Sequence, residues 1–411
     1  MTAARQVPLD NRPVERFALM TPPEKALLPA GMSDVLPPHA AFEADTVERL
    51  IAAFAGYGYE RVKPPLIEYE DTLLSGSGAA LAAQTFKLVD PLSQRTLALR
   101  ADMTMQIARI AATRLAHRPR PLRLSYAGQV VRVVGSELRA ERQFGQVGAE
   151  LVGVHCPRAD VEIITMAAGS LADLGGEGLS VDLGLPTLVS FLVPEGSCSD
   201  EARAALREAL DCKDASAVAA LAPAIGAAQA DLLGRLVAAA GAPEATIAAL
   251  EAADLPPLAA AERDALVDVY AHVARAAPWL DVSIDVVEYR GLEYHSGVTF
   301  SLYAKRVRGE LARGGRYPVG DGEPATGVTL IMDTVLECLP RRPGKRRVMV
   351  PLEAAADASL RLRQNDWITV HAVAEAPDLD AEAARLRCGF VLDGGDVRPI
   401  RPQPATRTRT A

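Results

Sequence analysis

The sequence predicts an α+β protein built from more than one domain. Segments with helical spacing of apolar residues alternate with strand-like segments in residues 29–199 and 279–340, which we predict to form one core. Residues 200–278 are dominated by alanine and leucine and predict a helical insertion. Residues 341–411 are polar and predict a short C-terminal region, and residues 1–28, rich in proline and charge, predict a flexible leader. The length of 411 residues fits two or three domains.

The elements of the first half follow from local periodicity. Apolar residues recur at helical spacing over 40–55 and predict a helix, and 59–62 then reads as an extended segment. Residues 87–99 alternate around a turn and predict a hairpin. Residues 102–115 return to helical spacing and predict a second helix.

Further strands are predicted on both sides of the insertion. Residues 122–133 and 144–154 predict two strands joined by a polar loop. Strand-like sequence returns at 283–289 and again at 298–303, and the second of these segments is expected to end in the glycine pair Gly314-Gly315.

Composition excludes several classes of protein. The net charge of −8 and the isoelectric point near 5.4 oppose a nucleic-acid partner, and we read the basic segment 341–347 and the basic tail as solvated linker and tail. No apolar run approaches about 20 residues, so no membrane span is predicted. The five cysteines are odd in number and widely spaced, which fits a reducing cytoplasm, and neither the cysteines nor the six histidines show metal-ligand spacing.

A polar face on the predicted strand 144–154 is the first candidate for a binding site. Alternation places Gln146, Gly148 and Glu150 on one face of the strand. Gly148 would let a small ligand approach the backbone, while the amide and the carboxylate beside it could accept an amine or imidazole N–H. A salt bridge between Glu150 and an arginine on a neighbouring strand is the structural alternative.

Arg132 ends the preceding strand and is a second candidate. Alternation puts it on the same face as Tyr126, where its guanidinium could bind a carboxylate through two hydrogen bonds. The alternative is a structural ion pair with Glu137, Glu141 or Glu150.

The turn-like run at 289–297 carries further polar groups. Arg290 and His295 could contact a ligand there, although a histidine at such a position is also a common packing residue. The glycines of 311–317 permit close backbone approach but do not match a phosphate-binding loop. No pattern indicates a nucleophile.

Taken together, the order of these segments resembles the histidyl-tRNA synthetase family across residues 29–340. The segments that carry the resemblance are 29–37, 99–104, 126–153, 289–295 and 314–317. The resemblance implies a class II aminoacyl-tRNA synthetase-like fold, with an antiparallel sheet flanked by helices, a histidine pocket and a homodimer formed through the first motif region.

The resemblance also implies a role for individual residues. Asp102 and Thr104 would hold the amino group of L-histidine, and Arg132 would lie near its carboxylate. The remaining ligand contacts would come from Gln146, Glu150, Arg290, His295 and Tyr317. Asp102 is shorter than the glutamate of the synthetases, and His295 replaces a tyrosine.

Two departures remove groups that the synthetases use for ATP. Val134 stands where a glutamate touches ATP, and Thr334 stands where an arginine lies over the adenine and triphosphate. Adenylate formation depends on fixed positive charge at the phosphoryl centre, so we expect aminoacylation to be lost.

Within the family, a histidine pocket without ATP motifs and with a short C-terminus resembles the ATP phosphoribosyltransferase regulatory subunits. This resemblance implies a cytoplasmic, non-catalytic protein of histidine biosynthesis that carries no cofactor. It would associate with the catalytic subunit in a hetero-oligomer, activate it and mediate allosteric feedback by L-histidine, with no tRNA partner.

Two other functions stay open at this point. A diverged histidine-dependent ligase or weak synthetase would catalyse pyrophosphate exchange with histidine and ATP. A purely structural remnant would bind no histidine.

Overall fold

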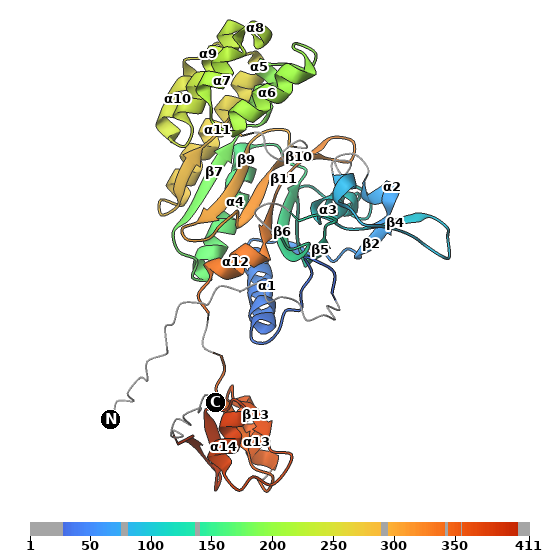
Figure 1. The fold of residues 1–411 in the computed structure, drawn as a ribbon, viewed down its shortest axis with the longest axis vertical. Helices are drawn as coiled ribbons and strands as arrows, with labels where there is room; N and C mark the ends of the chain where they lie inside the picture. Colours follow the sequence, from blue (N-terminus) through green and yellow to red (C-terminus); the bar gives the residue numbers. More distant parts are fainter. Residues whose placement is uncertain are drawn as a thin grey trace, which may run out of the picture. The chain divides into compact units, whose positions relative to one another are not determined.

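The computed structural model describes residues 28–74, 81–135, 140–288, 295–341, 344–354 and 356–401. The chain divides into two compact units at Pro340, and each unit is described by itself (Figure 1). Residues 1–27 of the predicted leader and the candidate Arg290 lie outside the described residues.

A mixed sheet forms the centre of the first unit. Its eight strands, within the described ranges, are β1 (Glu60–Arg61), β5 (Leu122–Val131), β6 (Gln143–Val152), β7 (Leu179–Gly184), β8 (Asp281–Ile284), β9 (Thr299–Ala304), β10 (Ala312–Val319) and β11 (Glu323–Ile331). They are arranged in the order β1-β5-β6-β11-β10-β9-β7-β8. The pairs β1–β5 and β7–β8 are parallel and the other neighbours are antiparallel, so the predicted antiparallel core is present (Figure 1).

Several helices pack against this sheet. The helices α1 (His39–Gly56), α4 (Pro157–Asp173) and α12 (Met332–Cys338) cover one face, and α3 (Thr104–Ala112) contacts β6 and β10. Val147, Ala149 and Leu151 of β6 are buried in the cluster that contains α1 and α4. The predicted alternation along this strand is therefore confirmed, because Gln146 and Glu150 point to the opposite face.

A small sheet carries the predicted hairpin. It has the strand order β2-β4-β3, formed by β2 (Ile67–Tyr69), β3 (Lys87–Val89) and β4 (Thr96–Leu99), with α2 (Glu70–Leu73) beside it. The helix predicted at 102–115 begins two residues later, at Thr104. Asp102 lies in the turn before the helix, where its side chain accepts a hydrogen bond from the Thr104 N–H at 2.8 Å.

The alanine-rich segment is helical, as its composition predicts. Its helices are α6 (Asp200–Asp211), α7 (Ala215–Ala220), α8 (Ala222–Ile225), α9 (Ala227–Ala239), α10 (Pro243–Glu251) and α11 (Pro257–Ala276), preceded by α5 (Thr187–Leu192). Leu206, Leu233 and Leu266 of these helices are buried in the same apolar cluster as the sheet residues. The helical segment therefore packs onto the sheet through a shared core.

The predicted end of the strand at the glycine pair is wrong. Gly314 and Gly315 lie inside β10, paired with β9 and β11. A Cβ on Gly314 would overlap the Gly327 carbonyl oxygen and the Phe300 ring, so glycine is required by the close approach of neighbouring strands. Among the described residues, no helix is both long and apolar enough to cross a membrane.

The second unit, Arg341–Ala411, contains a small sheet of its own. Within the described part of this unit, the sheet has the order β13-β12-β14-β15 and is accompanied by two helices. These elements are β12 (Arg347–Val350), α13 (Ala356–Gln364), β13 (Ile368–His371), α14 (Leu379–Arg385), β14 (Phe390–Asp393) and β15 (Asp396–Pro399). Met349, Val350 and Val391 are fully buried, and Trp367 meets Phe390 edge-on at 4.9 Å. The apolar residues sit in four-residue strands, which are too short for periodicity to reveal.

Candidate functional site

The start of α3 is joined to β6 by polar contacts. Gln146 Nε2 donates to Asp102 Oδ2 at 2.8 Å, and Gln146 Oε1 accepts from the Met103 N–H at 3.1 Å. Asp102 in turn accepts from the Thr104 N–H. Three of the candidates, Asp102, Thr104 and Gln146, are thus brought together as the sequence predicts.

Glu150 lies at the centre of a buried hydroxyl network. The Tyr126 hydroxyl donates to Glu150 Oε1 at 3.0 Å, and the Tyr317 hydroxyl donates to Glu150 Oε2 at 2.8 Å. Tyr126 is also within 3.2 Å of Thr104 Oγ1 and 2.8 Å of Thr329 Oγ1. The alternative of a structural salt bridge is wrong, because in the described part of the chain two tyrosines occupy the place of the arginine.

Burial controls the protonation of Glu150. Loss of hydration raises the pKa of its carboxyl to about 8, and the hydrogen bonds from Tyr317 and Tyr126 oppose that shift. The charge of Asp102 adds to the increase. Glu150 therefore carries a proton at neutral pH, so it can donate a hydrogen bond as well as accept one.

The predicted gap at Gly148 is filled by a neighbouring side chain. A Cβ at Gly148 would overlap the ring and hydroxyl of Tyr126, which lies directly opposite on β5. The interpretation that a ligand approaches the backbone there is therefore wrong. Alternation along a single strand does not assign Tyr126 to the site, although a tyrosine opposite a glycine on a buried strand is a usable signal.

A narrow cavity opens beside this network. Its described walls are Thr104, Glu150, His295, Arg313, Gly314, Gly315, Tyr317, Gly327, Val328 and Thr329. Four of the candidates line it: Thr104, Glu150, His295 and Tyr317. Arg313, Gly327 and Thr329 were not predicted, because their place on the wall depends on how β10 and β11 pair with β6.

Arg132 lies apart from this cavity wall. β5 ends at Val131, so the alternation that placed Arg132 on the site face no longer applies. Its Nε donates to the Ala101 carbonyl at 3.2 Å, and its guanidinium lies 5.1 Å from the centre of the Phe144 ring. Arg132 therefore supports the segment that carries Asp102.

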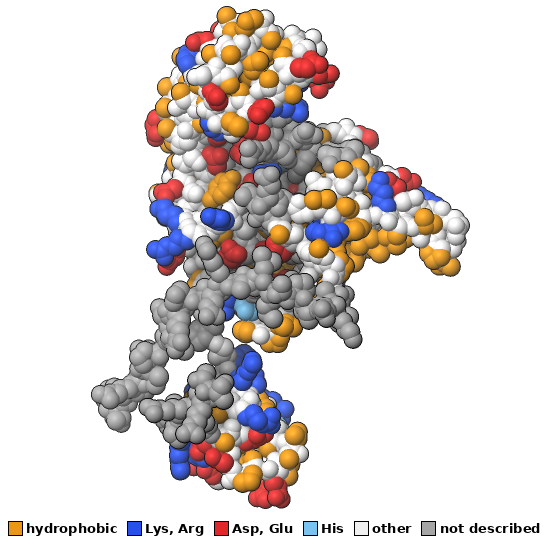
Figure 2. Space-filling view, in the orientation of Figure 1, with side chains coloured by type: hydrophobic (Ala, Val, Ile, Leu, Met, Phe, Trp, Pro, Cys, Tyr) orange, Lys and Arg blue, Asp and Glu red, His pale blue; other side chains and the backbone are white. Residues whose placement is uncertain are grey.

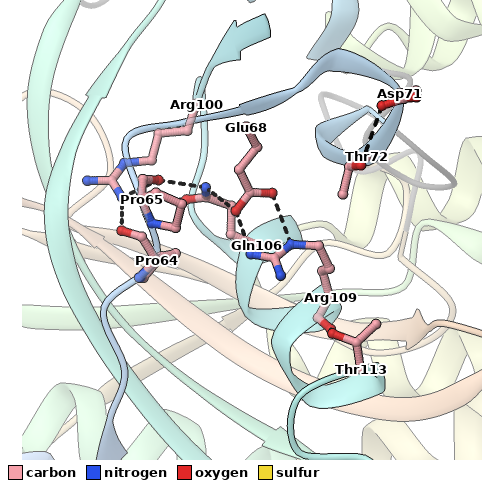
Figure 3. A network of polar contacts seen from close by, with 9 residues as sticks. All are labelled: Pro64, Pro65, Glu68, Asp71, Thr72, Arg100, Gln106, Arg109 and Thr113. Atoms are coloured by element: carbon pink, nitrogen blue, oxygen red, sulfur yellow. Dashed lines mark hydrogen bonds and ion pairs between the residues drawn. The ribbon is translucent and has the colours of Figure 1, made fainter. Parts of the chain in front are cut away.

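Arg100 belongs to a network of polar contacts that also holds this segment (Figure 3). Its guanidinium donates to the carbonyls of Pro64 and Gln129, at 3.2 and 2.8 Å. Gln106 bridges the Pro65 carbonyl and Glu68, and Arg109 pairs with the same Glu68 carboxylate (Figure 3). These bonds tie the start of α3 to β2 and β5 and so fix the position of Asp102 and Thr104.

The two positions that depart from the synthetase pattern have different environments. Val134 is 66% exposed. Thr334 is buried in the first turn of α12, where its hydroxyl donates to the Glu310 carbonyl at 2.6 Å. Neither side chain can supply a charge to a phosphate group.

A larger cavity of about 530 Å³ lies where the helical segment meets β7, β8 and β9. Its polar lining includes Asp182, Asp211, Lys213, Ser283, Asp285, Glu288 and Tyr303. Lys213 pairs with Asp285 at 2.5 Å. Acidic side chains also gather on the visible surface around this junction (Figure 2).

The fold and the site define a protein of the histidyl-tRNA synthetase class. The family model described as histidyl-tRNA synthetase matches residues 31–335. A structure described as an ATP phosphoribosyltransferase regulatory subunit/histidyl-tRNA synthetase from Bacillus halodurans superposes with a TM-score of 0.75 at 25% identity, covering 89% of this chain and 97% of that one. Histidyl-tRNA synthetase from Nostoc shares the fold, with a TM-score of 0.71 at 17% identity and coverage of 89% and 90%. The predicted class II fold is confirmed.

Relatives of higher sequence identity show to which family within this class the chain belongs. ATP phosphoribosyltransferase regulatory subunits from Rhodospirillum centenum and Rhodospirillum rubrum are 50% and 47% identical to this chain. The alignments cover 93% and 92% of this chain and 98% and 97% of the relatives. The chain belongs to the family of ATP phosphoribosyltransferase regulatory subunits, which confirms the resemblance found in its motifs.

Proposed function

We propose that this regulatory subunit binds L-histidine in the cavity beside Glu150. The buried Glu150–Tyr126–Tyr317 network is the observation that carries the proposal, because it holds a buried carboxyl group between two tyrosine hydroxyls with no ion-pair partner among the described residues. A carboxyl so placed is suited to an imidazole, which both donates and accepts hydrogen bonds. Asp102 and Thr104 would receive the amino group, and His295 would close the cavity.

The subunit would not activate histidine with ATP. The buried hydroxyl of Thr334 replaces the arginine expected over the triphosphate, and the exposed apolar side chain of Val134 replaces the glutamate expected to touch ATP. Pyrophosphate exchange in the presence of histidine and ATP tests this part. Robust exchange would establish a ligase instead.

The proposed partner is the catalytic ATP phosphoribosyltransferase subunit, in the cytoplasm and without tRNA. A relative of the same fold comes from an ATP phosphoribosyl transferase complex of Thermotoga maritima, with a TM-score of 0.55 at 17% identity and coverage of 71% and 97%. Histidine would inhibit the assembly by binding one arrangement more tightly than another, and its differential affinity sets the size of the effect.

We also propose a homodimer within this assembly. The small sheet exposes Ile67, Leu88 and Val89, and Leu92 at its tip is 93% exposed. Figure 2 shows apolar side chains along this small sheet. A contiguous apolar strip on a sheet is a common protein–protein contact surface.

Titration calorimetry with L-histidine, followed by an activity assay of the reconstituted complex with and without histidine, tests the proposal. We expect Glu150→Ala to abolish the heat of binding and to leave co-purification with the catalytic subunit intact. Glu162→Ala is a matched control, because Glu162 also accepts a tyrosine hydroxyl, at 2.9 Å from Tyr59, but lies outside the cavity. A wild-type protein that gives neither heat nor thermal stabilisation with histidine would contradict the ligand assignment.

A further inference from the structure

A polar row crosses the sheet on the face that carries the cavity. Cross-strand pairing aligns Tyr126, Gly148, Thr329, Arg313, Ser301 and Asp182. Residues paired directly across neighbouring strands share a face, so Arg313 lies next to Thr329 and one strand further from β6. Through this row, β10 supplies the positively charged side chain of Arg313 to the cavity. The sequence predicts only Tyr317 as a site residue on this strand.

The Arg313 side chain is held in place by a fixed partner. Its Nη2 donates to Glu310, three residues earlier in the chain. The carboxylate of Glu288 and the hydroxyl of Tyr303 lie close enough to act on its charge, and both line the larger cavity. Arg313 therefore stands between the two cavities and lines the smaller one.

Among the described residues that line the smaller cavity, Arg313 is the one with a permanent positive charge. Asp102 is suited to an amino group and Glu150 to an imidazole, and neither side chain supplies a positive charge to a carboxylate. Arg132, the residue expected near the carboxylate, contacts Ala101 and Phe144 and lies away from the wall. Arg313 places a permanently charged guanidinium on that wall, and the planar fork of this group is suited to a carboxylate.

We propose that Arg313 recognises the carboxylate of the amino-acid ligand and so selects amino acids over the corresponding amines. The inference rests on the proposed histidine site and names a specificity residue for it. Glu310 orients the guanidinium and also competes with the ligand for its hydrogen bonds. Neutralising Glu310 should therefore strengthen carboxylate binding, and removing the guanidinium should weaken it.

Calorimetry with two ligands separates this role from a structural one. Histamine has the imidazole and the amino group of L-histidine but no carboxylate. We expect the wild-type protein to bind L-histidine more tightly than histamine, and Arg313→Met to reduce that preference by about tenfold or more, the loss of one charge-assisted hydrogen-bonded pair. We expect Glu310→Gln to increase the preference severalfold, since its backbone carbonyl still accepts from Thr334.

The outcomes are distinguishable. Failure of the wild-type protein to bind either ligand would overturn the proposed histidine site. Normal histidine binding with an unchanged preference in both variants would overturn the role of Arg313 alone. If Arg313→Met does not fold, as shown by its thermal transition, Glu310→Gln decides, because a merely structural pair predicts equal changes for both ligands.

Discussion

Gly327 lies directly opposite Glu150 in the ladder between β11 and β6, and its missing side chain gives the carboxyl group its space. A Cβ built at Gly327 would overlap Glu150 Oε2. The neighbouring carbonyl of Ala149 is also 3.0 Å from that position, so the strand cannot easily shift to make room.

Gly327→Ala should therefore displace Glu150 from its tyrosine partners. We expect a loss of roughly 1–3 kcal/mol in the free energy of unfolding, as for overpacked cores, and loss of histidine binding. Chemical denaturation and calorimetry measure the two effects. Gly234→Ala in α9 is the control, because its added methyl group meets nothing within 4 Å and should leave both quantities unchanged or slightly improve stability. Equal behaviour of the two variants would mean that Glu150 has other room to occupy.

The raised pKa of Glu150 predicts a pH dependence of stability. The unfolded chain releases this proton near pH 4.5 and the folded protein near pH 8, so the folded state binds more protons between these values. The free energy of unfolding should accordingly fall as the pH rises from about 4.5 to about 8. Glu150→Gln stays neutral, so its decline over this window should be shallower, as urea denaturation at several pH values would show.

Glu162→Gln provides the matched comparison. The pKa of Glu162 is lowered, chiefly by its hydrogen bond with Arg123, so its contribution is present above the ordinary pKa and is lost only in more acidic solution. The difference between wild type and Glu162→Gln should be flat from pH 6 to 8. A flat difference for Glu150→Gln as well would show that Glu150 is ionised in the folded protein.

Arg100→Met should loosen the segment that carries Asp102 and Thr104. The substitution leaves the carbonyls of Pro64 and Gln129 without this donor, and we expect a loss of about 2–4 kcal/mol of stability. Hydrogen exchange should accelerate at residues 100–107. Arg61→Met, which removes an exposed ion pair with Glu48, should alter neither quantity appreciably. If hydrogen exchange at residues 100–107 is unchanged in Arg100→Met, then Gln106 and Arg109 hold this segment in place without Arg100.

The two compact units should unfold in separate transitions. The two tryptophans, Trp279 and Trp367, lie one in each unit, so Trp279→Phe and Trp367→Phe leave one fluorescent reporter apiece. Val391→Ala removes a fully buried side chain from the second unit and should cost roughly 2 kcal/mol there. We expect the denaturation midpoint reported by Trp367 to fall while that reported by Trp279 stays constant. A shift of both midpoints would indicate one cooperative transition.

Much of the site could be predicted where a residue's position depends on its own strand. Alternation along 144–154 correctly put Gln146 and Glu150 on one face, and the motif order placed Asp102 and Thr104 beside them. The contributions of Tyr126, Thr329 and Arg313 depend on pairing between strands far apart in the chain. Local sequence does not specify that register, so these residues were missed.

Two other differences also have physical causes. Alternation does not determine the side on which Arg132 lies, because β5 ends one residue earlier. The sequence does not predict the individual strands of the C-terminal unit, because strands of four residues bury a few side chains each, as Met349 and Val391 do, without forming a recognisable apolar run. Arg290 and the other candidates for ligand contact stay predictions.

The Tyr126 side chain fills the space that a side chain at Gly148 would occupy, so the sizes of the residues at these two positions depend on each other. A relative with a larger residue at the position of Gly148 would need a smaller one at that of Tyr126, and would then lose a hydroxyl from Glu150. We therefore expect relatives either to keep both the tyrosine and the glycine or to replace both residues.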